Sequence, residues 1–332
     1  MTLRIQHGNL EHANWFVVNW CLGNTCNFKC SYCSPGLHDG SVKWPDKDTV
    51  ISFIQKMLIH SGSLGKKLYL ELTGGEVTMW RHFEEVALFC KEHGVKLGII
   101  SNGSRTLRWW EENKHLFDHV CLSFHPEQAE VDHFLAVIKI LRLELRTHVN
   151  IMMLPAQFNE CYEVATKVKN IGNVSLALQP LIIGFGDTLY PYTKQQQFVF
   201  DNQYDLVVKH IKWTKGFEYY RGAMSVVDEA NVVGETLAAH RFISMKENNW
   251  SGWECYAGVE QIIVDMDGSI HRGWCKVGGN LGTIQNPTFT LEPVVCNKTM
   301  CHCNYDIMST KVNTLKLNAA TSLRLIPVYP VA

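Results

Sequence analysis

The sequence predicts an α/β fold in which helices cover a parallel sheet and a small cysteine-rich domain follows. Within residues 14–181, six segments with a strand pattern alternate with helical segments. Parallel strands need helical crossovers, so this alternation indicates consecutive β/α units. The pattern changes after residue 185, and of the twelve cysteines four lie by residue 33 and five after residue 254. We therefore expect an α/β core with a separate module behind it.

The elements of the core follow from the local pattern of apolar residues. Short apolar runs predict strands, and apolar residues at helical spacing predict helices. Asp46 suits the N-cap of the first helix, and Gly94 suits the end of the second. The predicted strands are residues 14–22, 66–72, 95–101, 119–124, 148–154 and 174–181. The predicted helices are residues 46–60, 79–94, 107–117, 130–144 and 160–172.

The second half of the chain has a weaker pattern. Residues 184–193 are typical of a loop, residues 196–213 of a helix, and residues 258–275 of a β-hairpin turning at Asp267–Gly268. Residues 214–250 show no clear pattern. The predicted division of the chain is a core at 1–185, a helical linker or substrate-side segment at 186–250, a cysteine-rich domain at 251–310 and a tail at 311–332.

Composition narrows the classes of protein. Of the 332 residues, 46% are hydrophobic and 19% are charged, so a large core is expected. The 31 basic residues nearly balance the 32 acidic ones, which argues against a nucleic-acid partner. We find neither the pattern of a secretory signal nor an apolar run long enough for a membrane helix, so we expect a soluble, cytoplasmic protein. In that compartment clustered cysteines are metal ligands more often than disulfides.

Polar and cysteine residues recur where the predicted strands end. The first strand leads into three cysteines, the second into Gly74–Gly75–Glu76 and the third into Ser101–Asn102–Gly103. The carboxyl ends of parallel strands meet at one edge of a sheet, where ligands bind. Further polar candidates on the later strands are Ser123, His125, Asn150 and Gln179. All of these groups are therefore expected to converge on one face.

The stretch NTCNFKCSYC, residues 24–33, places three cysteines at C-x3-C-x2-C spacing. A structural zinc site normally takes four ligands from paired C-x2-C or Cys/His elements. An iron–sulfur cube also takes four, but three protein thiolates leave one iron open to a small molecule. Zinc binding or unrelated thiols are the alternatives to a cluster.

Over residues 14–185 the sequence resembles the radical S-adenosylmethionine (SAM) superfamily, through this cysteine run with Tyr32 before its last cysteine and through the Gly-Gly-Glu loop. The resemblance implies a partial (β/α)6 TIM-like barrel and a SAM-binding 4Fe-4S cluster on Cys26, Cys30 and Cys33. It also implies SAM contacts from Tyr32, Gly74, Gly75, Glu76, Ser101, Asn102, Ser123, Asn150 and Gln179. In this scheme the Glu76 carboxylate binds the methionine ammonium group and Tyr32 packs near the adenine. His125 either faces substrate or caps its strand.

A second group of cysteines comprises Cys255, Cys275, Cys296, Cys301 and Cys303. With the intervening hairpin, this order is similar to the twitch and SPASM extensions of radical SAM enzymes. The resemblance implies one auxiliary 4Fe-4S cluster, for which four of the five thiolates suffice. Zinc on four thiolates is the alternative. The remaining cysteines, at positions 21, 90, 121 and 161, are expected to be small buried side chains.

The resemblance implies reductive cleavage of SAM to a 5′-deoxyadenosyl radical, which removes a hydrogen atom from a substrate. The substrate is expected to be a ribosomal peptide or protein, with a small sugar, cofactor or antibiotic precursor as the alternative. A flavodoxin or ferredoxin is an expected electron donor, and a separate protein could supply peptide recognition. A non-catalytic iron–sulfur or zinc protein is the competing class, and the Gly-Gly-Glu loop argues against it.

Overall fold

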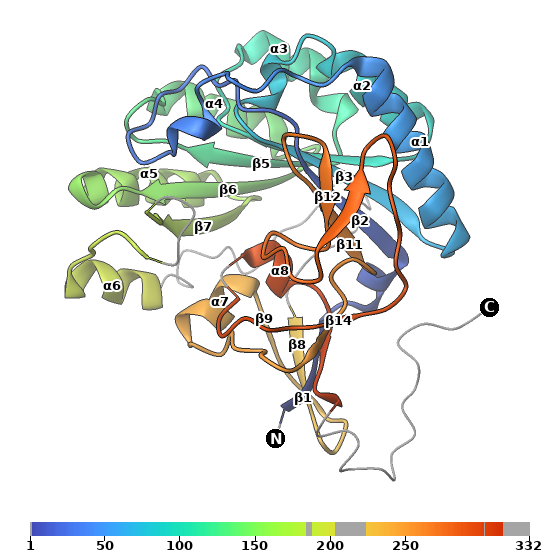
Figure 1. Ribbon diagram of the computed structural model, residues 1–332. Coiled ribbons are helices and arrows are strands. Elements are labelled where there is room, and N and C mark those ends of the chain that lie inside the picture. The colour runs from blue at the N-terminus through green and yellow to red at the C-terminus, as the bar shows by residue number, and fades with distance from the viewer. Residues whose placement is uncertain (1, 184–187, 203–223, 302, 315–332) are drawn as a thin grey trace.

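Two β-sheets organise the computed structural model, which describes residues 2–183, 188–202, 224–301 and 303–314 (Figure 1). The larger sheet has nine strands in the order β13-β12-β11-β2-β3-β4-β5-β6-β7, and the smaller has six in the order β14-β10-β15-β1-β8-β9. Within the described ranges, no helix is long and apolar enough to cross a membrane.

The six predicted strands lie in the larger sheet and pair in parallel, each with the next. They are β2 (Trp15–Cys21), β3 (Lys67–Thr73), β4 (Lys96–Ser101), β5 (His119–Phe124), β6 (Arg146–Met153) and β7 (Ser175–Pro180). The sheet ends at β13 and β7 and does not close into a barrel. The mixed α/β fold with a parallel sheet is thus confirmed.

Five helices cover one face of these strands (Figure 1). They are α1 (Lys47–Ser63), α2 (Phe83–Glu92), α3 (Leu107–Asn113), α4 (Val131–Leu141) and α5 (Phe158–Ile171). The Asp46 carboxylate caps α1 by accepting hydrogen bonds from the backbone N–H groups of Asp48 and Thr49, as predicted. The predicted helix at 79–94 begins later, because a 3-10 turn (Val77–Met79) precedes α2.

The predicted hairpin is present as β11 (Gln261–Val264) and β12 (Ser269–His271). The sequence did not predict where this hairpin lies. Strand β11 pairs in parallel with β2 and thereby extends the core sheet. Strand β13 (Asn280–Thr283) then pairs with β12. The predicted helix at 196–213 is observed as α6 (Lys194–Asp201), and most of its remainder lies outside the described residues.

The smaller sheet joins the two ends of the described chain. Its strands are β1 (Thr2–His7), β8 (Met224–Asp228), β9 (Val233–Leu237), β10 (Glu254–Cys255), β14 (Val294–Val295) and β15 (Lys311–Val312). Two short helices, α7 (Ala239–Ser244) and α8 (Asn304–Ile307), accompany it. Strand β1 pairs with β8 and β15, so strand pairing crosses the predicted domain limits, which stay a prediction.

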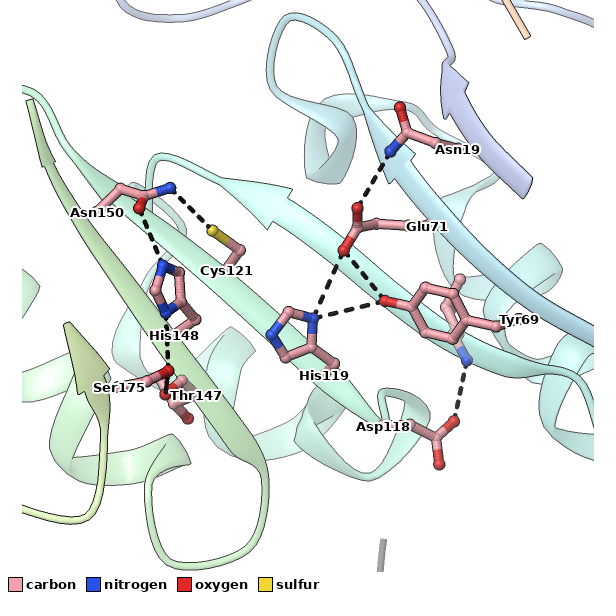
Figure 2. A network of polar contacts seen from close by, with 11 residues as sticks. Asn19, Tyr69, Glu71, Asp118, His119, Cys121, Thr147, His148, Asn150 and Ser175 are labelled. Carbon is pink, nitrogen blue, oxygen red and sulfur yellow. Dashed lines mark hydrogen bonds and ion pairs between the residues drawn. The ribbon is translucent and has the colours of Figure 1, made fainter. Parts of the chain in front are cut away.

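The face of the core sheet opposite the helices, here called the inner face, carries buried polar groups. Glu71 accepts hydrogen bonds from Asn19 Nδ2 and from the Tyr69 hydroxyl, each at 3.1 Å. His119 Nδ1 lies 3.6 Å from the same carboxylate (Figure 2). The Trp274 indole donates to Asn19 Oδ1 at 3.1 Å, so this network also ties the C-terminal segment to the core.

Gly98 on β4 leaves the space that the Tyr69 hydroxyl occupies in this network, so we expect a larger residue there to be destabilising. A Cβ built on Gly98 would overlap the Tyr69 hydroxyl and lie 2.7 Å from Tyr69 Cζ. Because Tyr69 is fully buried and cannot swing away, we expect Gly98→Ala to lower the free energy of unfolding by about 1–3 kcal/mol. Urea denaturation measures the change. Gly62→Ala is the control, because a Cβ at Gly62 in α1 meets nothing within 4 Å and should be neutral or stabilising.

Candidate functional site

The three N-terminal cysteines lie in the loop between β2 and α1. Cys30 is buried and Cys26 and Cys33 are half-buried, all three as free thiols. The Phe28 N–H donates to Cys26 Sγ at 3.4 Å, and the Cys33 N–H donates to the Cys30 carbonyl at 3.1 Å. Burial, with a smaller contribution from the neighbouring thiolates, raises the pKa of Cys30 to about 11. The loop therefore brings its three cysteines near one another as free thiols.

The number of thiols bears on the metal group that they could bind. A 4Fe-4S cube takes four ligands, and three thiolates from one loop would leave one iron open to a small molecule. The cluster on Cys26, Cys30 and Cys33 stays a prediction.

The Gly74–Gly75 turn after β3 packs directly on the start of the cysteine loop. Both glycines have positive φ, 97° and 52°. A Cβ on Gly75 would lie 2.7 Å from the Thr25 carbonyl carbon and 2.8 Å from the Thr25 nitrogen. The Glu76 N–H also donates to the Thr25 carbonyl at 2.8 Å. These contacts require glycine on both steric and conformational grounds, and they hold the two loops together.

The Glu76 side chain is fully buried and links the loop after β3 to the loop after β4. Its carboxylate accepts hydrogen bonds from the Thr78 N–H and hydroxyl, from the Ser101 hydroxyl at 2.9 Å and from the Asn102 N–H at 2.7 Å. Burial raises the pKa of Glu76, and these hydrogen bonds oppose that effect. An ammonium contact by this carboxylate stays a prediction, because its oxygens already accept four hydrogen bonds inside the protein.

Asn102 contacts both Glu76 and the cysteine loop. Its Nδ2 donates to Asn27 Oδ1 at 3.0 Å and lies 3.7 Å from Cys26 Sγ. The Ser104 hydroxyl donates to the same Asn27 oxygen at 3.3 Å. The predicted Ser101–Asn102 pair is thus brought against the cysteines, with Asn27 as a partner that the sequence pattern did not single out.

The loop after β5 contacts the C-terminal part of the cysteine run, at Ser31 and Tyr32. The Tyr32 hydroxyl lies 2.8 Å from His125 Nδ1, and their rings are parallel with centroids 6.0 Å apart. Burial lowers the pKa of His125 to about 4, which favours a neutral ring. The Glu127 carboxylate accepts from the Ser31 N–H at 2.6 Å and from the Ser31 hydroxyl at 2.5 Å. The sequence analysis did not identify Glu127. The one feature of the sequence that could have indicated it is an acidic residue two positions after His125.

The remaining predicted SAM contacts lie on the strands. Ser123 is buried on β5. Asn150 Nδ2 donates to Cys121 Sγ at 3.3 Å, and its Oδ1 lies 3.0 Å from His148 Nε2 (Figure 2). Gln179 Nε2 donates to the Pro180 carbonyl at 3.2 Å. These bonds place Asn150 in the wall of the inner face; its predicted role, like that of Gln179, stays a prediction.

The five C-terminal cysteines are all free thiols, of which Cys275 follows β12 of the larger sheet. Cys255 lies on β10, which pairs with β14 just before Cys296. The Asp306 carboxylate accepts from the Trp274 and Cys275 N–H groups, at 3.0 and 2.8 Å. Asn248 exchanges two hydrogen bonds with the backbone of Cys301. Burial raises the pKa of Cys275 to about 12, and the neighbouring Asp306 and Cys255 add to this effect.

Parts of this chain are similar to known proteins. Residues 20–167, less than half of the chain, match the model of the Radical SAM superfamily. A curated relative from Psychrobacter lutiphocae, named an S-adenosylmethionine-dependent nucleotide dehydratase, is 34% identical over 111 residues. That stretch covers 30% of this chain and 37% of the relative's own length.

Solved structures share the fold at low sequence identity. Native anSMEcpe with bound AdoMet has a TM-score of 0.50 at 18% identity, covering 82% of this chain and 79% of that chain. Streptococcus suis SuiB bound to precursor peptide SuiA has a TM-score of 0.50 at 14% identity, covering 83% of this chain and 64% of that chain. These structures show a shared fold, and the match over residues 20–167 agrees with the predicted resemblance of the core to the radical SAM superfamily.

Proposed function

We propose that the protein binds SAM and a 4Fe-4S cluster and cleaves SAM reductively to start radical chemistry on a substrate. The observation that carries this proposal is the convergence of three strand-end loops, after β3, β4 and β5, on the C-x3-C-x2-C loop. An electron carrier needs the thiolates alone. A Gly-Gly-Glu turn packed on the cysteine loop is a further element that an electron carrier would not need.

Each part of the site has a role in this proposal. Cys26, Cys30 and Cys33 hold the cluster, which when bound supplies the electron that breaks a carbon–sulfur bond of SAM. The Gly74–Gly75 backbone lies against SAM, while Glu76 positions the loops around it. The protein otherwise contributes orientation and exclusion of water.

For the substrate we propose a peptide or protein, supported by the SuiB fold, which was solved with a precursor peptide. A small polar molecule is the second candidate, because the curated relative with 34% identity is named a nucleotide dehydratase. The polar inner face of β6 and β7, where His148, Asn150 and Ser175 are half-buried, can hydrogen-bond to either kind of substrate.

The proposal also includes one auxiliary 4Fe-4S cluster on four of the five C-terminal cysteines, in a twitch-like domain. Support comes from five free thiols on converging segments, fixed by Asp306 and Asn248. Anaerobically reconstituted protein should hold about eight irons with matching sulfide, from two cubes. About four irons together with one zinc would instead identify the second site as a zinc site.

Cleavage of SAM is the direct test. Reconstituted protein with SAM and dithionite is expected to release 5′-deoxyadenosine, whereas Cys30→Ala should release none above background, because its cluster loses a ligand. Liquid chromatography with mass spectrometry measures the product. Equal yields from the two proteins would reject the proposal. Deuterium transfer into 5′-deoxyadenosine from labelled peptides or labelled nucleotides then distinguishes the two substrate classes.

A further inference from the structure

Lys311 is a buried cation beside the C-terminal cysteines. It lies on β15 directly opposite Cys255 of β10 and is only 2% exposed. Its Nζ donates to the carbonyls of Asp306, Ile307 and Ser309 at 2.7, 2.9 and 2.8 Å. It also lies 4.7 Å from the ring centroid of Trp250. The ammonium group is therefore fully hydrogen-bonded, mainly to the last turn of α8.

Hydrogen bonds to carbonyls do not neutralise the charge. Burying an ammonium group costs several kcal/mol unless an anion accompanies it. Among the described residues, no carboxylate forms a direct ion pair with Lys311; the buried Asp306 carboxylate accepts hydrogen bonds from two backbone N–H groups and keeps its own negative charge nearby. If packing alone mattered, methionine would fill the same volume without that cost. A further negative group beside Lys311 would therefore find a fixed cation that has no direct ion-pair partner among the described residues.

The neighbouring thiols point to that group. Cys255 is the strand partner of Lys311, and Cys301 packs against the apolar cluster that contains Trp250. A second cation, Arg272, is held nearby by its hydrogen bond to the Ala257 carbonyl and by close contact with Gly258 and Gly278. Four thiolates on an oxidised 4Fe-4S cube carry a net charge of about −2, and one-electron reduction adds another negative charge.

We propose that Lys311 is a positioning residue whose charge stabilises the reduced auxiliary cluster and so raises its reduction potential. This inference rests on the auxiliary cluster of the proposed function. The step is a one-electron reduction of the cluster by an external reductant, and Lys311 keeps its protons throughout. Because its Nζ is fixed by three carbonyls, its charge stays close to Cys255 in both redox states.

The test isolates the auxiliary cluster in the full-length chain. Replacing Cys26, Cys30 and Cys33 by alanine removes the first cluster, and a redox titration followed by electron paramagnetic resonance reports the second alone. In this background Lys311→Met should keep about four irons. We expect its equilibrium constant of reduction to fall at least tenfold, or about 59 mV for a one-electron couple. The matched control is Lys298→Met, which removes the same charge from an exposed position between Cys296 and Cys301, where solvent screens it.

Lys311→Arg separates charge from packing. A potential near that of the unsubstituted background in Lys311→Arg, with a lowered one in Lys311→Met, supports the proposal. Equal potentials in the Lys311→Met and Lys298→Met variants overturn it, as does loss of iron from both Lys311 variants. A triple-alanine background without iron overturns the inference as well, while SAM cleavage by the unmodified protein still decides the proposed function separately.

Discussion

Glu76→Ala is expected to lower the free energy of unfolding by about 2–4 kcal/mol and to cut formation of 5′-deoxyadenosine at least a hundredfold. The reason is that Glu76 is fully buried and its carboxylate satisfies donors from two loops. Its removal leaves the Asn102 and Thr78 N–H groups without an acceptor, and each buried unsatisfied group costs about 1–3 kcal/mol. The Ser101 and Thr78 hydroxyls can rotate to other partners, which limits the loss of stability.

Activity should suffer more than stability in this variant, because Asn102 contacts both Asn27 and Cys26 of the cysteine loop. A misplacement of about 1 Å can reduce a reaction rate a hundredfold. Urea denaturation and anaerobic product analysis measure the two effects. Glu127→Ala is the comparison. Glu127 is half-buried, and among the described residues its hydrogen bonds go to Ser31, so its loss of stability should stay below about 1.5 kcal/mol. If the two alanine variants are equally stable and active, Glu76 does not organise the site.

The strands and helices of the core could be predicted because each one has a recognisable pattern of apolar residues within its own segment. Buried parallel strands are short apolar runs, and the helices between them keep helical spacing, so β2 to β7 appear in the sequence in order. Strand β1 was missed, although its residues alternate between half-buried and buried. Its partners β8 and β15 lie more than two hundred residues away, and no local pattern identifies such partners.

The candidate site also contains residues that the sequence could predict and residues that it could not. The cysteines and the Gly-Gly-Glu turn were visible because their chemistry or conformation demands particular residue types. The contacts of Asn27 and Glu127 were not visible, because each depends on a loop brought close by folding. Asp306 and Lys311 were missed for the same reason, since an acid and a lysine are ordinary residues until folding buries them beside cysteines. Sequence patterns therefore predicted the candidate ligand groups, whereas the side chains that contact those groups could be identified only from the structure.

Gly75→Ala is expected to damage the candidate SAM site more than any other glycine substitution in it. The new Cβ would overlap the backbone of Thr25, which cannot rotate away as a flexible side chain could. The loops after β2 and β3 must separate, which breaks the hydrogen bond from the Glu76 N–H to the Thr25 carbonyl. Overpacking of this kind costs about 1–3 kcal/mol, and positive φ adds about 1 kcal/mol. We expect affinity for SAM to fall at least tenfold, measured by equilibrium dialysis of the reconstituted protein.

Gly40→Ala separates conformational strain from the steric clash. Gly40 also has positive φ, 71°, and it belongs to the same β2–α1 connection, but its Cβ would meet only Thr25 Oγ1 at 3.6 Å. This control should lose about 1 kcal/mol of stability while keeping its iron and its affinity for SAM. Were Gly75→Ala to match Gly40→Ala in SAM affinity, close packing of the two loops would be irrelevant to the site. A difference confined to Gly75→Ala instead ties SAM binding to the contact between the glycine turn and the cysteine loop.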